Sequence, residues 1–268
     1  MSNIPKKIHY CWFGENELPE LTQKCMESWR KNCLGYEIIE WNEKNFNINC
    51  NEYVKEAYQC KKWAFVSDYV RLKVLYEEGG IYVDTDLEII KSFDDLLKLK
   101  SFIGFEDNQG LSTAVIGAVP KSNWIFKWME YYETNNFIKQ DGSMDTTTNV
   151  EIISKMLTKT TNLEFNNTMQ ILNNGIKVFP KEYFSPKEYA TNIMKITNNT
   201  YAIHHFDSSW LGELEIKKLR RGFKLRKIFG NTFGKISNNI IYGFEKYGIL
   251  GPLKVFVEFK KRKKEKYV

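Results

Sequence analysis

The stretch "EEGGIYVDTDLEII", residues 77–90, places two aspartates, Asp84 and Asp86, in a run of apolar residues. The β-branched and aromatic residues of this run predict a strand. Buried strands rarely carry charge unless the charge is paired or binds a metal. In an extended chain, side chains at positions i and i+2 point to the same side, where two carboxylates would repel each other. The stretch therefore predicts a strand whose carboxylates face a cation.

The segments around this strand alternate between helical and strand periodicity. Apolar residues recur at spacings of 3 and 4 within residues 51–80, which predicts a helix that ends at Gly79 and Gly80. Further strands are expected at residues 7–13, 36–41, 101–106, 111–119, 175–180 and 201–206, and further helices at 18–33, 123–134 and 149–159. Strands that alternate with helices predict an α/β domain with a mostly parallel central sheet flanked by helices.

The composition is ordinary for a soluble globular protein of 268 residues. The five cysteines are odd in number and form no C-x-x-C pair, and with only three histidines the chain is a poor candidate for a zinc site. We interpret the cysteines as reduced thiols of a cytoplasmic protein. We also expect no secretory signal, and no apolar run approaches the roughly 18–20 residues that cross a membrane.

The charge is distributed unevenly and divides the chain into two expected domains. Residues 217–268 hold 16 Lys and Arg against 3 Glu, a net charge of +13, whereas residues 1–216 hold 23 against 30, a net charge of −7. From Phe229 to Tyr247, apolar residues recur at steps of 4, 3, 4, 4 and 3. This pattern predicts a basic amphipathic helical tail at 217–268 that binds an anionic membrane surface, so that the protein is peripheral on the inner face of the cell membrane.

Two other interpretations of the basic tail remain open. It could pack on residues 1–216 with a solvated lysine-rich end, an alternative that carries equal weight. Nucleic-acid binding is less favoured, because residues 1–216 are acidic and contain no matching motif. We therefore expect no nucleic acid among the partners.

The D-x-D motif has the chemistry of a divalent-cation site. Mg²⁺ and Mn²⁺ prefer oxygen ligands and keep positions open for water and substrate phosphates. In open α/β sheets, ligands bind beyond the carboxyl ends of the strands. A bare D-x-D also occurs by chance on solvated surfaces, but the apolar strand and the preceding Gly79 and Gly80 favour a site here.

Two further motifs bring polar residues into the same region. In "SDYVR", Asp68 and Arg71 are three residues apart and share a helix face, either as a surface ion pair or as groups that hold hydroxyls and phosphate. In "AIHHFDSSW", residues 202–210, the adjacent His204 and His205 face opposite sides of a strand, so one of them at most faces a given pocket.

Three segments resemble the glycosyltransferase sugar-binding DXD family: "IPKKIHYCWFG", "AFVSDYVRLKVLYEEGGIYVDTDLEI" and "IHHFDSSW". That family includes bacterial capsular-polysaccharide and lipopolysaccharide sugar transferases and the yeast initiating α-1,6-mannosyltransferases, with the glucosylating domains of large clostridial toxins as distant relatives. The resemblance covers residues 4–120 and 175–212. It implies a GT-A fold, a nucleotide-sugar donor, a Mn²⁺ or Mg²⁺ cofactor and retention of anomeric configuration.

The resemblance also implies roles for single residues. Asp86 would bind the metal directly, and Asp84 would bind both the donor ribose and the metal. Asp68 and Arg71 would hold the donor sugar and diphosphate, and Trp12 at the end of the first strand would lie against the base.

Near the end of the resemblance, Ser208 and Trp210 would complete the donor site. The toxins have a carboxylate as a metal ligand shortly before this pair. A histidine takes its place in this chain, and spacing favours His205 over His204.

The function expected from these features is retaining transfer of a hexose from a nucleotide-sugar, most simply a UDP-hexose, to a hydroxyl of a glycan or lipid-linked saccharide acceptor in surface polysaccharide synthesis. Asp84, Asp86 and Arg71 would carry the catalysis. No residue is assigned as a nucleophile, and three are candidates by position only: Glu106, Asp107 and Asn149.

Two other functions are compatible with a D-x-D motif. A non-catalytic nucleotide-sugar-binding protein would use the same residues. A phosphatase of the haloacid-dehalogenase type is disfavoured, because its pattern requires Thr or Val where this chain has Glu88.

Overall fold

The computed structural model describes residues 3–107, 110–187, 193–207, 213–252 and 254–255. The chain forms two compact units. Met1–Lys187 with Met194–Phe206 makes up the first, here called the sheet unit, and Glu188–Ile193 with Asp207–Val268 makes up the second, the hairpin unit. The boundary expected from the charge pattern, after residue 216, falls within the first turn of a helix of the hairpin unit.

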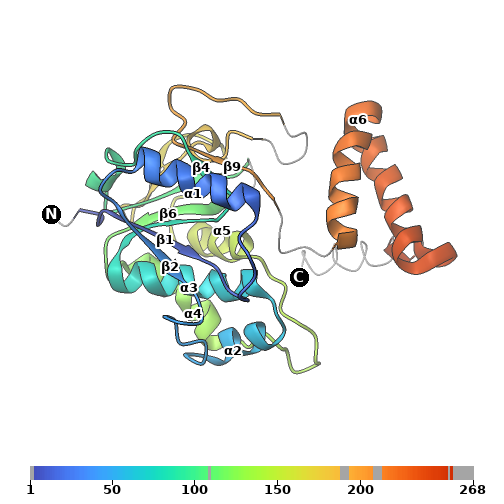
Figure 1. The fold of residues 1–268 in the computed structure, drawn as a ribbon, viewed down its shortest axis with the longest axis horizontal. Coiled ribbons are helices and arrows are strands. Elements are labelled where there is room, and N and C mark those ends of the chain that lie inside the picture. The colour runs from blue at the N-terminus through green and yellow to red at the C-terminus, as the bar shows by residue number, and fades with distance from the viewer. Residues whose placement is uncertain (1–2, 108–109, 188–192, 208–212, 253, 256–268) are drawn as a thin grey trace. The chain divides into compact units, whose positions relative to one another are not determined.

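The sheet unit is built on a seven-stranded sheet with the order β2-β1-β3-β6-β5-β8-β7 (Figure 1). The strands are β1 (Lys7–Cys11), β2 (Glu37–Trp41), β3 (Gly80–Val83), β5 (Ser101–Phe105), β6 (Leu111–Ala118), β7 (Gln170–Ile171) and β8 (Lys177–Phe179). Five of the seven run in one direction, and β6 and β7 run in the other. This confirms the predicted α/β class with a mostly parallel central sheet.

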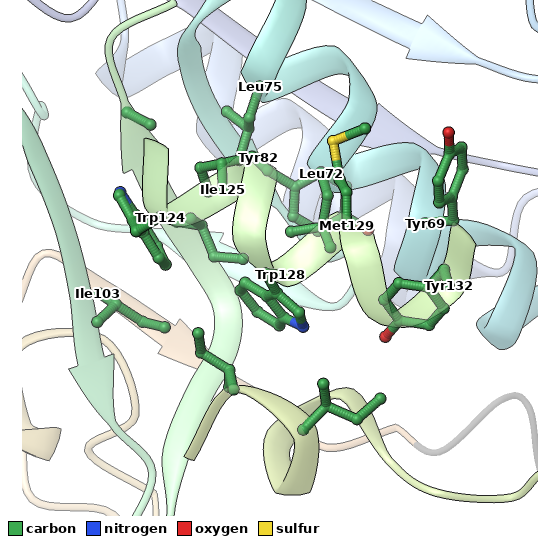
Figure 2. Close-up of a cluster of buried hydrophobic side chains, with 14 of the residues drawn as sticks. Tyr69, Leu72, Leu75, Tyr82, Ile103, Trp124, Ile125, Trp128, Met129 and Tyr132 are labelled. Carbon is green, nitrogen blue, oxygen red and sulfur yellow. The ribbon is translucent and has the colours of Figure 1, made fainter. Parts of the chain in front are cut away.

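Helices cover both faces of this sheet. They are α1 (Glu20–Asn32), α2 (Glu52–Gln59), α3 (Trp63–Glu78), α4 (Asn123–Thr134) and α5 (Asn149–Thr160). On one face α3 and α4 pack through Leu72, Leu75, Ile125 and Met129 (Figure 2). On the other face Trp29 of α1 is fully buried in a second core, so the sheet is shielded on both sides.

The single helix expected over residues 51–80 is two helices. α2 ends at Gln59 and α3 starts at Trp63, and between them Lys61 has a positive φ of 55° that no α-helix can contain. The end of α3 is as predicted. Gly79 adopts a φ of 67° and its N–H donates to the carbonyl of Leu75.

The continuous strand expected over residues 81–90 is also interrupted. β3 ends at Val83, and a turn closed by the hydrogen bond from the Leu87 N–H to the Asp84 carbonyl (3.0 Å) follows it. β4 (Leu87–Ile89) then leaves the main sheet and pairs antiparallel with β9 (Ala202–His204). Aspartate and threonine favour turns, because their side chains compete for nearby backbone groups. The extended geometry assumed for the two aspartates was therefore wrong.

The outer edge of β4 is covered by side chains of α1. Trp29 Nε1 donates to the Leu87 carbonyl (2.6 Å), Asn32 Nδ2 donates to the Ile89 carbonyl (2.8 Å), and the Ile89 N–H donates to Ser28 Oγ (2.9 Å). An exposed strand edge would leave these backbone groups unpaired. The helix thus fixes the position of the segment that follows the aspartates.

The hairpin unit consists mainly of α6 (Glu213–Tyr247), which reverses direction at Gly230. That glycine has φ 75° and ψ 169°, a conformation that breaks the helix into two antiparallel halves (Figure 1). Within the part of the chain that the structure describes, every helix is too short or too polar to pass through a lipid bilayer.

Candidate active site

A buried ion-pair network lies where α3 meets the end of β3. Arg71 Nη1 is 3.2 Å from Asp84 Oδ1, and Arg71 Nη2 is 3.0 Å from Asp68 Oδ1. The Arg71 side chain is only 5% exposed, which excludes the alternative of a surface ion pair. Its guanidinium also donates to the Thr113 carbonyl (3.1 Å) and lies over the Tyr82 ring at 4.5 Å. The sequence-based grouping of Asp68, Arg71 and Asp84 is thus realised in three dimensions.

Two neutral side chains extend this network. Asn149, the first residue of α5, donates through Nδ2 to Asp68 Oδ1 (2.5 Å) and accepts from Thr113 Oγ1 (3.1 Å). The Tyr82 hydroxyl donates to Asp84 Oδ1 (3.0 Å). Asn149 was a candidate by position alone, and the sequence offers no signal that links it to Asp68, 81 residues earlier. Both contacts hold the carboxylates in place.

Asp84, Asp86 and His204 form a candidate metal centre. Each offers one ligand atom, and these atoms lie within 4.8 Å of one another. His204 Nε2 is 3.4 Å from Asp86 Oδ1, and His204 Nδ1 is buried with no hydrogen-bond partner among the described residues. An unpartnered buried nitrogen is costly unless a ligand satisfies it. Two carboxylates and an imidazole are a donor set that suits a divalent cation, so the residues present fit the metal that the motif predicts.

The histidine of this cluster is His204, which corrects the preference for His205. In the β4–β9 ladder, His204 lies opposite Leu87, and the His205 N–H donates to the Asp86 carbonyl (3.1 Å). Successive side chains point to opposite sides, so His205 turns away and its Nε2 lies 2.9 Å from Glu88 Oε2. Sequence spacing could not fix this register.

Burial and charge shift the pKa values of the site. Burial raises the pKa of Asp68 to about 7, although Arg71 opposes the shift. Burial would lower the pKa of His204, but the negative charge of Asp86 and its hydrogen bond outweigh burial and raise the pKa to about 9. Burial also raises the pKa of Glu106, which lies in the field of the same carboxylates. Without a metal, His204 therefore carries a proton at neutral pH.

Trp12, Ser208 and Trp210 are the remaining residues predicted to contact the donor. Trp12 directly follows β1, and because β1 and β3 are parallel neighbours it lies at the same sheet edge as Asp84. Its indole Nε1 donates to the Asn16 carbonyl (2.7 Å). Ser208 and Trp210 lie outside the described residues, so their predicted roles remain predictions.

The family comparison agrees with this geometry. Residues 19–103, which include Asp68, Arg71, Asp84 and Asp86, match the model of the glycosyltransferase sugar-binding region containing a DXD motif. Residues 19–103 thus carry the DXD sugar-binding region of glycosyltransferases. This match confirms the predicted resemblance, and the observed sheet confirms the expected α/β fold with a mostly parallel central sheet.

Curated relatives match parts of the chain. Glucan organizing enzyme 1 of Cryptococcus neoformans is 37% identical over 84 residues, which cover 28% of this chain and 23% of that protein. Mannosyl phosphorylinositol ceramide synthase CSH1 of Saccharomyces cerevisiae is 25% identical over 224 residues, 77% of this chain and 53% of that protein. Inositol phosphoceramide mannosyltransferase 1 of Schizosaccharomyces pombe is 28% identical over 139 residues, 47% and 42%. The chain thus spans about half or less of the length of these three relatives.

Solved structures give partial matches. PaToxG glycosyltransferase aligns with a TM-score of 0.48 and 18% identity, covering 59% of this chain and 70% of that one. A glycosyltransferase involved in the glycosylation of the major capsid of PBCV-1 aligns with a TM-score of 0.43 and 10% identity, covering 75% and 94%.

Proposed function

We propose that this glycosyltransferase transfers a hexose, with retention of configuration, from a nucleotide-diphosphate sugar to a hydroxyl group of a glycan or lipid-linked saccharide. The observation that carries the proposal is the convergence of Asp84, Asp86 and His204 at the sheet edge next to the buried Arg71. Nucleotide sugars are anionic through their diphosphate, so their recognition at a carboxylate-rich edge requires a cation. The three clustered side chains supply its ligands.

The proposed metal is Mn²⁺, with Mg²⁺ as the alternative, held by Asp84, Asp86 and His204. The imidazole nitrogen favours Mn²⁺, because Mg²⁺ sites are built almost entirely from oxygen ligands. When bound, such a cation supplies positive charge to the diphosphate leaving group as the bond to the sugar breaks.

Arg71 acts in this proposal through the residues that it holds. Its donors are directed at Asp68, Asp84 and the Thr113 carbonyl, so the guanidinium fixes the orientation of both carboxylates. Its buried positive charge also offsets part of their negative charge at close range. Asp68, which Asn149 and Arg71 anchor, is placed to accept hydrogen bonds from donor hydroxyls as the family resemblance implies.

The relatives suggest candidate sugars and an acceptor, which direct assay can test. The resemblance to the toxin domains favours a UDP-hexose. The names of the yeast relatives, which contain mannosyltransferase and inositol phosphoceramide, add mannose as the sugar and a lipid-borne hydroxyl as the acceptor. A role in capsular or lipopolysaccharide synthesis is the biological setting in which such an acceptor would occur.

The test is turnover of a panel of UDP- and GDP-hexoses with Mn²⁺ or Mg²⁺, by hydrolysis and by transfer to saccharide acceptors. Asp84→Asn and Asp86→Asn should each lower kcat/KM by about 100-fold or more, because a metal ligand is lost. Glu88→Gln is the matched control, since this carboxylate lies two residues further along and pairs with His205 instead. It should remain within about threefold of the parent chain.

Two outcomes would contradict the proposal. Full turnover in Asp84→Asn and Asp86→Asn would remove the metal cluster from the chemistry. Tight donor binding with no hydrolysis or transfer under any metal would identify a non-catalytic nucleotide-sugar-binding protein. The proton NMR spectrum of the freshly formed product tests retention, which inversion at the anomeric carbon would overturn.

A further inference from the structure

The two halves of α6 pack through one face each. On the second half Asn238 and Tyr242 are buried against the first half. Asn238 Nδ2 donates to the Lys218 carbonyl (3.0 Å) and Asn238 Oδ1 accepts from Arg221 Nε (2.8 Å). Lys218 Nζ lies 3.8 Å from the centroid of the Tyr242 ring. These contacts define the inner face of the helical hairpin.

The opposite face of the second half is apolar and exposed. Phe233, Ile236, Ile240 and Phe244 are spaced at steps of 3, 4 and 4, which aligns them along one side of a helix. At about 100° per residue, this side lies roughly opposite Asn238 and Tyr242. The four residues, here called the apolar stripe, are between 44% and 71% exposed. Their exposure follows from the hairpin geometry, because the partner helix occupies the other side.

Exposed cationic side chains occur on both halves of the hairpin. Lys235 and Lys246 are exposed on the same half of α6, and Arg220 and Lys224 are exposed on the first half. Within residues 217–252, Glu245 is the one acidic residue in the sequence, and it is bound to Arg221 Nη1 at 2.6 Å. The hairpin therefore combines an exposed apolar stripe with a net positive charge.

We propose that the apolar stripe docks on the surface of an anionic lipid bilayer, with the helix parallel to the membrane plane. Phe233, Ile236, Ile240 and Phe244 enter the boundary between head groups and acyl chains, and the net positive charge of the hairpin attracts it to the lipid phosphates. Such a surface offers an apolar phase and negative charge together, and the hairpin matches both.

Charge argues against two other occupants. A second copy of the hairpin would bring together two segments of net charge +13 each, which repel at moderate ionic strength. A nucleic acid would neutralise the cations but leave two exposed phenylalanines, Phe233 and Phe244, without an apolar partner. The proposal is independent of the chemistry at Asp84 and Asp86, since it concerns the hairpin unit alone.

The experiment is sedimentation of the full chain with phosphatidylcholine vesicles and with vesicles that contain about 30% phosphatidylserine. The parent chain should sediment with the anionic vesicles and not with the neutral ones. The double variant Phe233→Ser/Phe244→Ser should bind at least roughly tenfold more weakly, because two inserted rings are lost. Leu34→Ser, which removes an apolar side chain that is 75% exposed in the sheet unit, is the matched control and should bind as the parent does.

A second variant separates charge from insertion. Lys224→Gln/Lys235→Gln should weaken binding severalfold, and so should an increase in salt from about 0.1 M to about 0.5 M. Circular dichroism of each variant checks that the helices remain.

Three results would overturn the proposal. One is unchanged vesicle binding by the double phenylalanine variant. Another is a lipid-free dimer that this variant dissociates, which would show that a second copy covers the stripe. The third is RNA or DNA binding that needs the two phenylalanines while vesicles do not bind.

Discussion

The two units each contain an arginine, a carboxylate and a buried asparagine in one hydrogen-bonded network, yet the networks differ in what they leave open. In the hairpin unit, Arg221 binds Asn238 and Glu245, and these contacts close the space between two helices. In the sheet unit, Arg71 binds Asp68 and Asp84, but Asp84 also faces Asp86 and His204. The same residue types therefore build a closed structural link in one unit and an open donor set in the other.

The difference comes from the elements that meet. The hairpin network joins two halves of one helix, and the buried atom left without a partner among its described residues is Arg221 Nη2, a donor that cannot bind a cation. The sheet-unit network lies where α3, β3 and the turn after β3 come together with β9, and the corresponding atom there is His204 Nδ1, which can bind one. Convergence of several elements at a sheet edge, rather than residue type, distinguishes the candidate site.

The largest expected effect is on stability, and it differs between variants of the two arginines. Arg71→Leu leaves the buried Asp68 and the partly buried Asp84 without their cation and should lower the free energy of unfolding by about 3–5 kcal/mol. Arg221→Leu breaks a pair whose side chains are 18% and 24% exposed, so the loss should be about 1 kcal/mol or less.

Tryptophan fluorescence and circular dichroism measure this difference during denaturation in EDTA. Six of the seven tryptophans precede residue 129 and lie in the sheet unit, so the fluorescence reports mainly on that unit. Arg71→Leu should shift the fluorescence transition and Arg221→Leu should not. Equal shifts for both variants would show that the two networks are energetically alike.

The second prediction contrasts two adjacent histidines. His204→Ala should weaken Mn²⁺ binding by about 100-fold, because it removes one of three clustered ligands. His205→Ala removes the partner of Glu88, a closed pair like that of the hairpin, and should leave Mn²⁺ binding within about twofold. Isothermal titration with Mn²⁺ measures both. If His205→Ala weakened Mn²⁺ binding more than His204→Ala did, His205 would be the ligand instead.

The third prediction concerns pH. The pKa of His204 is raised from its ordinary value of 6.5 to about 9, so without metal the proton on His204 stabilises the fold below pH 6.5, and this contribution is lost as pH rises through about 9. A metal ion must displace that proton. The Kd for Mn²⁺ should therefore fall by at most about tenfold per pH unit up to about pH 9.

Mn²⁺ titrations at several pH values, repeated with His204→Ala, measure this dependence. The steep region should be absent from the variant and unchanged in His205→Ala. A flat profile for the parent chain would mean that His204 is neutral before the metal arrives.

The smallest effect tests the hydroxyl that supports Asp84. Tyr82→Phe removes a buried hydrogen bond of 3.0 Å and should cost about 1 kcal/mol of stability. Tyr53→Phe is the matched control, because the Tyr53 hydroxyl is buried without a partner among the described residues and its removal should cost nothing. Chemical denaturation of the two variants measures both losses of stability. A larger loss for Tyr53→Phe than for Tyr82→Phe would contradict the prediction.

The sequence predicted those parts of the site that depend on local periodicity. The carboxyl end of β3 and the helix that carries Asp68 and Arg71 follow from apolar spacing, and the order of α and β segments implies that the carboxylates reach one sheet edge. The family motif assigned them a chemistry before any geometry was known. The helices at 123–134 and 149–159 were predicted within one residue of α4 and α5.

The sequence could not predict how strands that lie far apart in the chain pair with each other. Whether His204 or His205 faces the aspartates depends on how β9 pairs with β4, more than 110 residues away. A shift of one residue exchanges the two faces of a strand, and spacing cannot resolve it. The contact of Asn149 with Asp68 depends in the same way on where α5 begins relative to α3.

The turn from Asp84 to Leu87 passes the chain from the seven-stranded sheet to the two-stranded one, and His204 ends a strand of the latter. An ion held between Asp84 and His204 would therefore add a cross-link between two sheets that the turn, the side chains of α1 and a shared apolar core already join. Its arrival would slow amide hydrogen exchange along β9, so that occupancy of the metal centre stiffens the protein backbone just before residues 208–210, where two predicted donor contacts lie.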